Sequence, residues 1–241
     1  LKADAALGID TGDFPSGNLL FSPRLGFNWD IANDGVTLLR GGIGMFSGRV
    51  PFVWMSNAFT GTGGEQLTLI CTGTAVPAVT ADVNNLPTAC ASGGPPTPPL
   101  ANIVSFNSEF KFQQALKYSI GVDRRLPGGV VASLDFLHTR NYNTMYLDDV
   151  NLVEGQANGE GRVMYGTIAA SSSSTTQARK STGFRQVLVH TNKDQGYSTL
   201  ITAQLNKRFA NNLEFSAAYT YSQTKDVYSL TSSIASSNFN F

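Results

Sequence analysis

The sequence predicts an all-β protein that forms part of an antiparallel, up-and-down transmembrane β-barrel, with about six strands in three hairpins and long extracellular loops. Three observations predict this fold. Three segments alternate apolar and polar residues with a period of two, a short turn interrupts each segment once, and very long stretches separate the segments. A strand that alternates for about ten residues has one face suited to lipid and one suited to water.

The three alternating segments are residues 22–46, 112–137 and 197–224. Their turns are expected at Asn33-Asp34-Gly35, at Pro127-Gly128-Gly129 and at Ala210-Asn211-Asn212. Gly, Asn and Asp accept the left-handed dihedrals that a tight turn requires, and Pro presets the dihedral of the residue that opens it. Each segment is therefore expected to form a β-hairpin.

The third hairpin shows the alternation most clearly. In LITAQLNKRFANNLEFSAAYTY, which runs from Leu200 to Tyr221, the odd positions are mainly Ile, Ala, Leu, Phe and Tyr, and the even positions are mainly polar. Lys207 and Arg124 are basic residues at apolar positions, and both lie within three residues of a turn. A basic residue there reaches the membrane interface, where its cost falls to about 0 to 1 kcal/mol.

A soluble antiparallel β-sandwich would show the same alternation, because one face of each sheet packs on the other sheet. The asymmetry between short turns and long loops favours the barrel. So does the small share of the chain in strands, since six strands are too few to enclose a core and also support such loops.

The long loops are expected at residues 48–109 and 139–195. Both far exceed the few residues that usually join strands. Within the second, Arg162–Ile168 and Phe184–His190 are expected to extend strands beyond the main sheet. The first contains both cysteines of the chain, and a disulfide between Cys71 and Cys90 would indicate an oxidising compartment. Two unpaired thiols are the alternative.

Charge and composition exclude several partners and activities. The chain has 17 basic and 17 acidic residues, so it offers no electrostatic surface for nucleic acid. It has no run of about 18 apolar residues, so we expect no membrane-spanning helix. The beginning, LKADAALGID, has neither a starting Met nor a signal peptide, and we interpret residues 1–241 as an internal fragment of a longer protein.

No enzymatic, cofactor or metal site is predicted. The only histidines are His138 and His190, and Ser and Asp are so frequent that a triad could be drawn by chance. The stretch GGIGMFS has Ser47 where a dinucleotide-binding loop needs its third glycine. Asp148, Asp149 and Asn151 lack the regular spacing of a calcium loop.

The hairpins also resemble a known family. FSPRLGFNWDIANDGVTLLRGGIGMFSGRVP, from Phe21 to Pro51, is similar to a barrel segment of TonB-dependent outer-membrane receptors, in particular the Oar-like group. YSIGVDRRLPGGVVASLDFLHTRN and GYSTLITAQLNKRFANNLEFSAAYTYSQTKD resemble later hairpins of the same barrel. The three hairpins cover about half of the chain. The resemblance implies a barrel of about 22 strands with a plugged lumen, in the outer membrane of a Gram-negative bacterium.

The resemblance also implies partners and site residues. A receptor of this kind binds a ligand at the cell surface and imports it with energy coupled from the inner membrane. Its expected partners are outer-membrane lipid, the plug domain of the same parent chain, an inner-membrane energy-coupling complex and a surface ligand. This chain departs from the family pattern because it has no plug domain, no coupling motif and too few strands to close a barrel.

Two sets of candidate site residues follow from alternation and from position in the loops. The first set faces the lumen or plug: Arg24, Asp30, Arg40, Lys117, Asp135, Gln204, Arg208 and Glu214. The second set consists of aromatic loop residues that could meet a ligand: Phe52, Trp54, Phe59, Tyr142 and Tyr146. The alternative functions are a passive outer-membrane pore or surface adhesin, or a secreted soluble β-sandwich that acts as a binding module.

Overall fold

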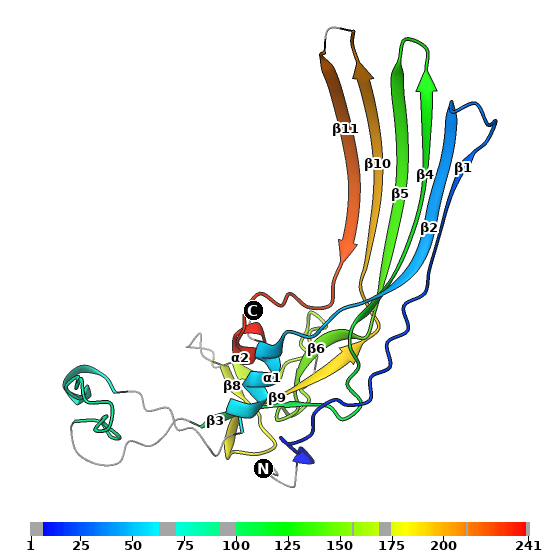
Figure 1. The fold of residues 1–241 in the computed structure, drawn as a ribbon. Coiled ribbons are helices and arrows are strands. Elements are labelled where there is room, and N and C mark those ends of the chain that lie inside the picture. Colours follow the sequence, from blue (N-terminus) through cyan, green and yellow to red (C-terminus); the bar gives the residue numbers. More distant parts are fainter. Residues whose placement is uncertain are drawn as a thin grey trace.

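Six long strands form one antiparallel sheet in the order β1-β2-β4-β5-β10-β11 (Figure 1). The computed structural model describes residues 7–62, 71–91, 100–155, 157–168, 175–210 and 212–239. The strands of the large sheet are β1 (Arg24–Asp30), β2 (Thr37–Ser47), β4 (Gln114–Leu126), β5 (Val130–Tyr142), β10 (Tyr197–Arg208) and β11 (Glu214–Lys225). Because β1 and β11 are its two edges, the sheet is an open section of a barrel wall, and the predicted fold class is confirmed.

The three predicted hairpins all turn at the same end of the sheet, which is the top of Figure 1. Asn33 has φ 59° and Gly35 φ 67°, Gly128 and Gly129 have φ 80° and 73°, and Asn212 has φ 58°. These are the left-handed dihedrals that the turn residues were expected to adopt. Asn211 lies outside the described residues. At the other end, β5 continues to Tyr142, five residues beyond the predicted hairpin, because Gln114 on β4 still pairs with Tyr142.

The sheet has an apolar outer face and a polar inner face. Large apolar side chains on the outer face are exposed, from 38% for Tyr118 to 76% for Leu25. The exposed set is Leu25, Phe27, Trp29, Ile43, Tyr118, Ile120, Leu134, Ile201, Leu205, Phe215, Tyr219 and Tyr221. No second sheet packs against the large sheet within the described residues, which favours the barrel over the soluble sandwich.

The two long segments expected as loops contain more regular secondary structure than predicted. They contain the helix α1 (Phe52–Thr60) and a three-stranded sheet with the order β3-β9-β6. The strands are β3 (Ala101–Phe106), β6 (Thr144–Asp149) and β9 (Phe184–Lys193). With α2 (Ala235–Phe239) these elements form what we call the loop unit, at the end of the large sheet opposite the turns (Figure 1).

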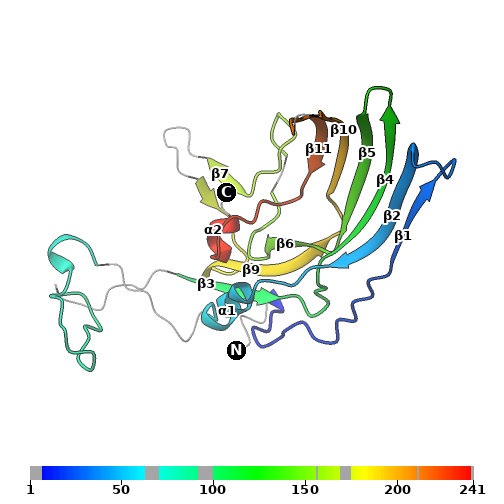
Figure 2. The same cartoon turned by 45° about the horizontal axis from the view of Figure 1, so that its top comes forward.

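One of the two predicted strand extensions is confirmed and the other is only partly a strand. Phe184–His190 lies in β9, which leads into β10 and projects beyond the large sheet, where it pairs with β6 and β3. The β3–β9 pair is parallel, with Val104 opposite Leu188. Of Arg162–Ile168, only β7 (Gly166–Ile168) is a strand, and it forms a small hairpin with β8 (Thr175–Gln177) (Figure 2).

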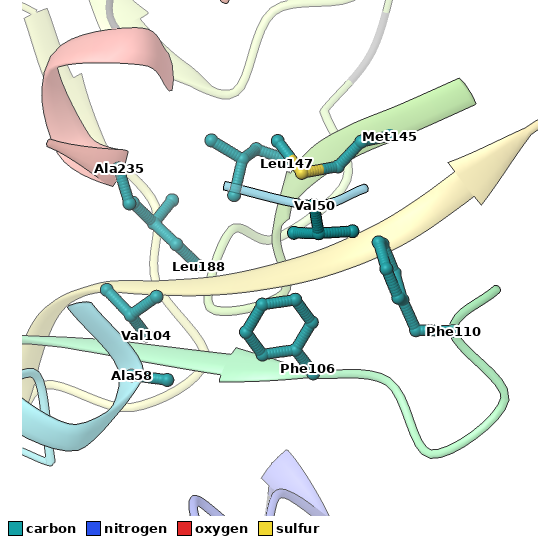
Figure 3. Packing of buried hydrophobic residues seen from close by; sticks show 9 residues of the cluster. All are labelled: Val50, Ala58, Val104, Phe106, Phe110, Met145, Leu147, Leu188 and Ala235. Atoms are coloured by element: carbon teal, nitrogen blue, oxygen red, sulfur yellow. The ribbon is translucent and has the colours of Figure 1, made fainter. Parts of the chain in front are cut away.

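The loop unit has its own hydrophobic core (Figure 3). Nine buried residues from the helices, the small sheet and the connecting segments form it: Val50, Ala58, Val104, Phe106, Phe110, Met145, Leu147, Leu188 and Ala235. Fully burying one Leu, Val or Phe side chain contributes about 1.5 to 3 kcal/mol. The unit can therefore hold a fixed shape without help from the membrane.

The segment 71–91 lies apart from the loop unit in both views (Figures 1 and 2). The predicted disulfide joins Cys71 to Cys90, with the two Cα atoms 5.6 Å apart, and a short 3-10 turn covers Gly73–Ala75. The alternative of two free thiols is therefore wrong. None of the helices in the described part of the chain is long and apolar enough to cross a membrane.

Candidate functional site

An ion-pair cluster lies on the inner face and joins three strands. Arg40 on β2 places its Nε 2.8 Å from Oδ2 of Asp123 on β4, and its Nη2 2.9 Å from the carboxylate of Asp135 on β5. The Ser133 hydroxyl donates a 2.5 Å hydrogen bond to Asp123 Oδ1. One guanidinium thus bridges two carboxylates with two different nitrogens of its planar set of donors.

Gly121 makes this bridge possible. It lies between Arg40 and Asp135 in the register of the three strands. A Cβ atom at this position would collide with the Asp135 carboxylate and crowd the Arg40 guanidinium. Because Gly121 has no side chain, Arg40 can reach across β4 to Asp135 on β5. The alternating pattern of the strand did not predict this need for a glycine.

Two of the eight predicted lumen-facing residues, Arg40 and Asp135, take part in this ion-pair cluster. Arg24 and Lys117 both lie against the ring of Phe46, at 4.3 Å and 5.4 Å from its centroid. Sequence reasoning left Asp123 and Ser133 out of the candidate set. Strand register could have found them, because they lie opposite each other on the polar side of β4 and β5.

The other four predicted lumen residues make local contacts. Asp30 accepts a 2.7 Å hydrogen bond from the backbone N–H of Gly35 and so stabilises the first turn. Gln204 donates a 3.1 Å hydrogen bond to Asn206 on the same strand. Arg208 and Glu214 form a 3.4 Å ion pair beside the third turn. These polar residues thus form separate local contacts rather than one compact site.

Aromatic rings surround a buried histidine in the loop unit. His190 on β9 is fully buried, and its ring stacks on Phe106 at 4.5 Å and on Trp54 at 6.1 Å between centroids. Neither ring nitrogen has a hydrogen-bond partner within the described residues. Burial lowers the pKa of His190 to about 4. The side chain is therefore neutral at pH 7 and acts as one of the stacked rings, not as a catalytic base.

The five predicted ligand residues differ in exposure. Phe52 and Phe59 on α1 are 68% and 63% exposed, and Phe59 stacks on Phe14 at 4.5 Å. Trp54 is half-buried against the core of the loop unit. Tyr142 and Tyr146 are also half-buried. Only the first two offer a large apolar surface to an incoming molecule.

Both half-buried tyrosines lie close to other side chains. The Arg140 guanidinium is 5.3 Å from the Tyr142 ring, and the Lys193 ammonium is 3.4 Å from the Tyr146 ring. Tyr146 also meets Tyr228 edge to face at 5.6 Å. Burial of Tyr228, and then repulsion between its phenolate and that of Tyr146, raises the pKa of Tyr228 to about 12.

The acidic end of β6 and the residues after it form hydrogen bonds with the backbone of the chain. Asp149 Oδ1 accepts hydrogen bonds from the N–H groups of Asn151 and Val187, and burial raises the pKa of this carboxyl despite those bonds. Asn151 donates to the carbonyls of Ser181 and Phe184 and accepts from the Ser181 N–H at 2.8 Å. Within the described residues, no group of three His, Cys, Asp or Glu side chains is placed to hold a metal ion.

Three comparisons with known proteins bear on this architecture. A family model described as outer membrane beta barrel domain matches residues 5–240. No curated protein matches the chain. The solved structures that are similar include the siderophore receptor PirA from Pseudomonas aeruginosa, at 13% identity and TM-score 0.42, with 84% of this chain and 28% of that chain covered.

Two further solved structures are similar to the same degree. The ferric enterobactin receptor PfeA from Pseudomonas aeruginosa has 14% identity and TM-score 0.46, with 83% of this chain and 21% of that chain covered. PirA from Acinetobacter baumannii has 16% identity and TM-score 0.46, with 87% and 23% covered. The chain thus spans less than a third of the length of these proteins. Since the family model matches nearly all of its residues, the chain belongs to the outer membrane beta barrel domain family.

Proposed function

We propose that this chain is the barrel segment of an outer-membrane receptor that binds a ligand at the cell surface and imports it. The observation that carries the proposal is the loop unit, with its hydrophobic core, at the end of the sheet opposite the short turns. In outer-membrane barrels, short turns lie on the periplasmic side and long loops on the outside. A loop region that folds into a fixed shape there supports specific recognition.

The energy source in this proposal is an inner-membrane coupling complex, and the partner inside the barrel is a plug domain of the parent chain. The resemblance of residues 21–51 to TonB-dependent receptors supports both. The inner face supports the plug, because its Arg40 cluster and polar rows offer hydrogen bonds to a folded domain. We do not assign catalysis to the chain.

The exposed aromatic residues of α1 are the first candidates for ligand contact. Phe52 and Phe59 present large apolar rings on the loop unit. Trp54, Tyr142 and Tyr146 are second candidates, because each is already half covered by neighbouring side chains. Ferric enterobactin is the first probe, since the name of one structural neighbour includes it.

The test uses cells that express the full-length parent protein as their only outer-membrane receptor for ferric enterobactin. Active import predicts accumulation of the labelled compound that a protonophore abolishes. The double variant Phe52→Ala, Phe59→Ala should bind the compound more weakly. Phe21→Ala is the matched control, because Phe21 is 76% exposed but lies outside the loop unit. Equal binding by both variants would remove the α1 aromatics from the site.

A ligand-independent measurement separates import from the alternatives. The purified full-length protein is inserted into a planar bilayer in potassium chloride. A plugged receptor conducts no steady current and binds the periplasmic domain of the coupling protein. A large steady conductance would show a passive pore. A closed barrel that does not bind the coupling protein would favour an adhesin.

A further inference from the structure

A short row of basic and aromatic residues lies on three adjacent strands of the outer face, at the end that carries the loop unit, and its neighbour on β4 is Leu116. Arg140 on β5, Tyr197 on β10 and Lys225 on β11 are direct register partners in three adjacent strands. Their positions alternate with the inner-face residues, so they share the outer face with Phe136, Ile201 and Tyr221. They line a hollow of about 570 Å³ together with His138, Asp194 and Asp226.

The side chains of the outer face become less polar from row to row, away from the loop unit. The next row is His138, Thr199 and Gln223, and the rows after it are Phe136, Ile201 and Tyr221, then Leu134, Ala203 and Tyr219. Each step of two residues rises about 7 Å along the strand. Cationic, then polar, then apolar rows are the order expected across the outer membrane interface into the hydrocarbon. The cationic row therefore lies at the level of the lipid headgroups.

The two cations are available to an external anion. Arg140 and Lys225 are exposed, and neither takes part in an ion pair within the described residues. The nearby carboxylates hold backbone groups instead: Asp194 accepts the N–H of Asn143 at 2.7 Å, and Asp226 accepts the N–H of Val227 at 2.8 Å.

The geometry suits a group the size of a phosphate. Neighbouring strands are about 4.8 Å apart, so Arg140 and Lys225 flank Tyr197 with their Cα atoms roughly 10 Å apart. Both side chains are long enough to converge on one anion above the Tyr197 ring. His138 stacks on Tyr197 at 6.0 Å and on Tyr118 at 5.0 Å, and its Nδ1 lies 2.8 Å from the Thr199 hydroxyl. The floor of the hollow is thus already ordered.

We propose that Arg140 and Lys225, with Tyr197 between them, bind a phosphate of a glycolipid headgroup in the outer leaflet. The occupant is a lipid rather than a soluble ion, because the hollow continues directly into the lipid-facing rows of the sheet. The inference depends on the outward orientation of the loop unit but not on transport. A failure of the import experiment would therefore leave it standing.

The test measures binding of lipid A to the purified full-length protein by native mass spectrometry. Arg140→Gln with Lys225→Gln should lower the bound fraction about tenfold or more, because two charge-assisted hydrogen bonds are lost. Arg124→Gln with Lys207→Gln is the matched control, since these basic residues lie on the same outer face beside the turns. The control should bind lipid A like the unaltered protein.

Three further binding measurements separate a specific lipid site from misfolding and from binding of a soluble anion. Dephosphorylated lipid A should bind as weakly to the unaltered protein as lipid A does to the double variant. Arg140→Lys with Lys225→Arg should retain binding, which separates lost charge from misfolding. Millimolar inorganic phosphate should not displace the lipid. Unchanged binding in the first variant, equal loss in both pairs, or displacement by inorganic phosphate would each overturn the proposal.

Discussion

All the buried hydrophobic side chains of the described residues lie outside the large sheet, whereas many large apolar side chains of that sheet point outward and remain exposed. Leu188 in β9 is completely buried, while Leu134 in β5 is 51% exposed. The two regions belong to one chain and contain similar residues. They differ in what covers those residues.

The difference indicates that the loop unit is surrounded by water and the outer face of the sheet by hydrocarbon. In water, exposed apolar surface is unfavourable by about 25 cal/mol per Å², so a loop unit outside the membrane must bury its own apolar side chains. In hydrocarbon, the same surface on the outer face of the sheet costs nothing. The polar inner face then needs its own partners, and the Arg40 cluster shows that the strands supply some of them.

Acid should weaken the loop unit through His190. The pKa of His190 is lowered to about 4 in the folded state, from a usual value of 6.5. Because the unfolded state binds the proton first, the free energy of unfolding falls as the pH drops through this window, by about 3 kcal/mol in all. Hydrogen exchange of the β9 amides, corrected for intrinsic rates, measures the loss.

His190→Phe should abolish this acid sensitivity, because a phenyl ring can stack on Phe106 and Trp54 without taking up a proton. Equal acid sensitivity in the unaltered protein and in His190→Phe would show that another group titrates.

A charge on the outer face should impair the sheet more than the same charge on the inner face. Ala217 and Ala218 are adjacent in β11, opposite Leu205 on the outer face and Gln204 on the inner face. Ala217→Arg should destabilise the full-length barrel by about 2 kcal/mol, because the guanidinium enters hydrocarbon. Ala218→Arg is the matched control and should cost less. Unfolding in urea from lipid vesicles measures both, and equal losses would contradict a lipid-covered outer face.

Removing the cation of the inner cluster should have a smaller effect. Arg40→Met leaves Asp123 and Asp135 without their shared partner, but the Arg40 side chain is 40% exposed, so we expect a loss of about 1 kcal/mol. Arg40→Lys should recover part of it, since the ammonium keeps the positive charge but lacks the separate Nε and Nη2 donors that contact the two carboxylates. Arg208→Met, at an ion pair whose Arg side chain is 83% exposed, should have almost no effect. Equal shifts of the melting temperature in Arg40→Met and Arg208→Met would refute a special role for the cluster.

Opening the disulfide should have the smallest effect on both regions. None of the described residues 71–91 is buried, and the segment lies apart from the loop unit. Cys71→Ser with Cys90→Ser should therefore leave the hydrogen exchange of β9 and β10 unchanged, although the segment itself becomes more mobile. Faster exchange in β9 would show that the segment supports the loop unit.

The alternation of apolar and polar residues predicted the large sheet, because the two strands of each hairpin are close together in the sequence. Alternation set the faces, and Asn33, Gly128 and Asn212 marked the turns. The pattern did not predict the loop unit, since its parallel pair joins Val104 to Leu188 across a distant part of the chain. Such pairing depends on long-range packing rather than on local preference.

The same reason limited the prediction of the candidate site. Alternation placed Arg40 and Asp135 on the inner face, but only the register of three strands brings them together with Asp123. Trp54 was expected as a loop residue free to meet ligand, whereas the fold stacks it on His190. Aromatic residues in long loops serve as core or as contact surface, and composition does not distinguish the two.

The most direct test of the central claim maps the surroundings of β11. A nitroxide is attached to single cysteines at positions 214 to 222 of the full-length protein in lipid vesicles; Cys71 and Cys90, the only cysteines of this chain, are joined in the disulfide. Collisions with oxygen, which dissolves in lipid, should peak at positions 215, 217, 219 and 221 and be low at the even positions. Oxygen collisions that show no period of two, or that are low at all nine positions, would contradict a hydrocarbon-covered outer face.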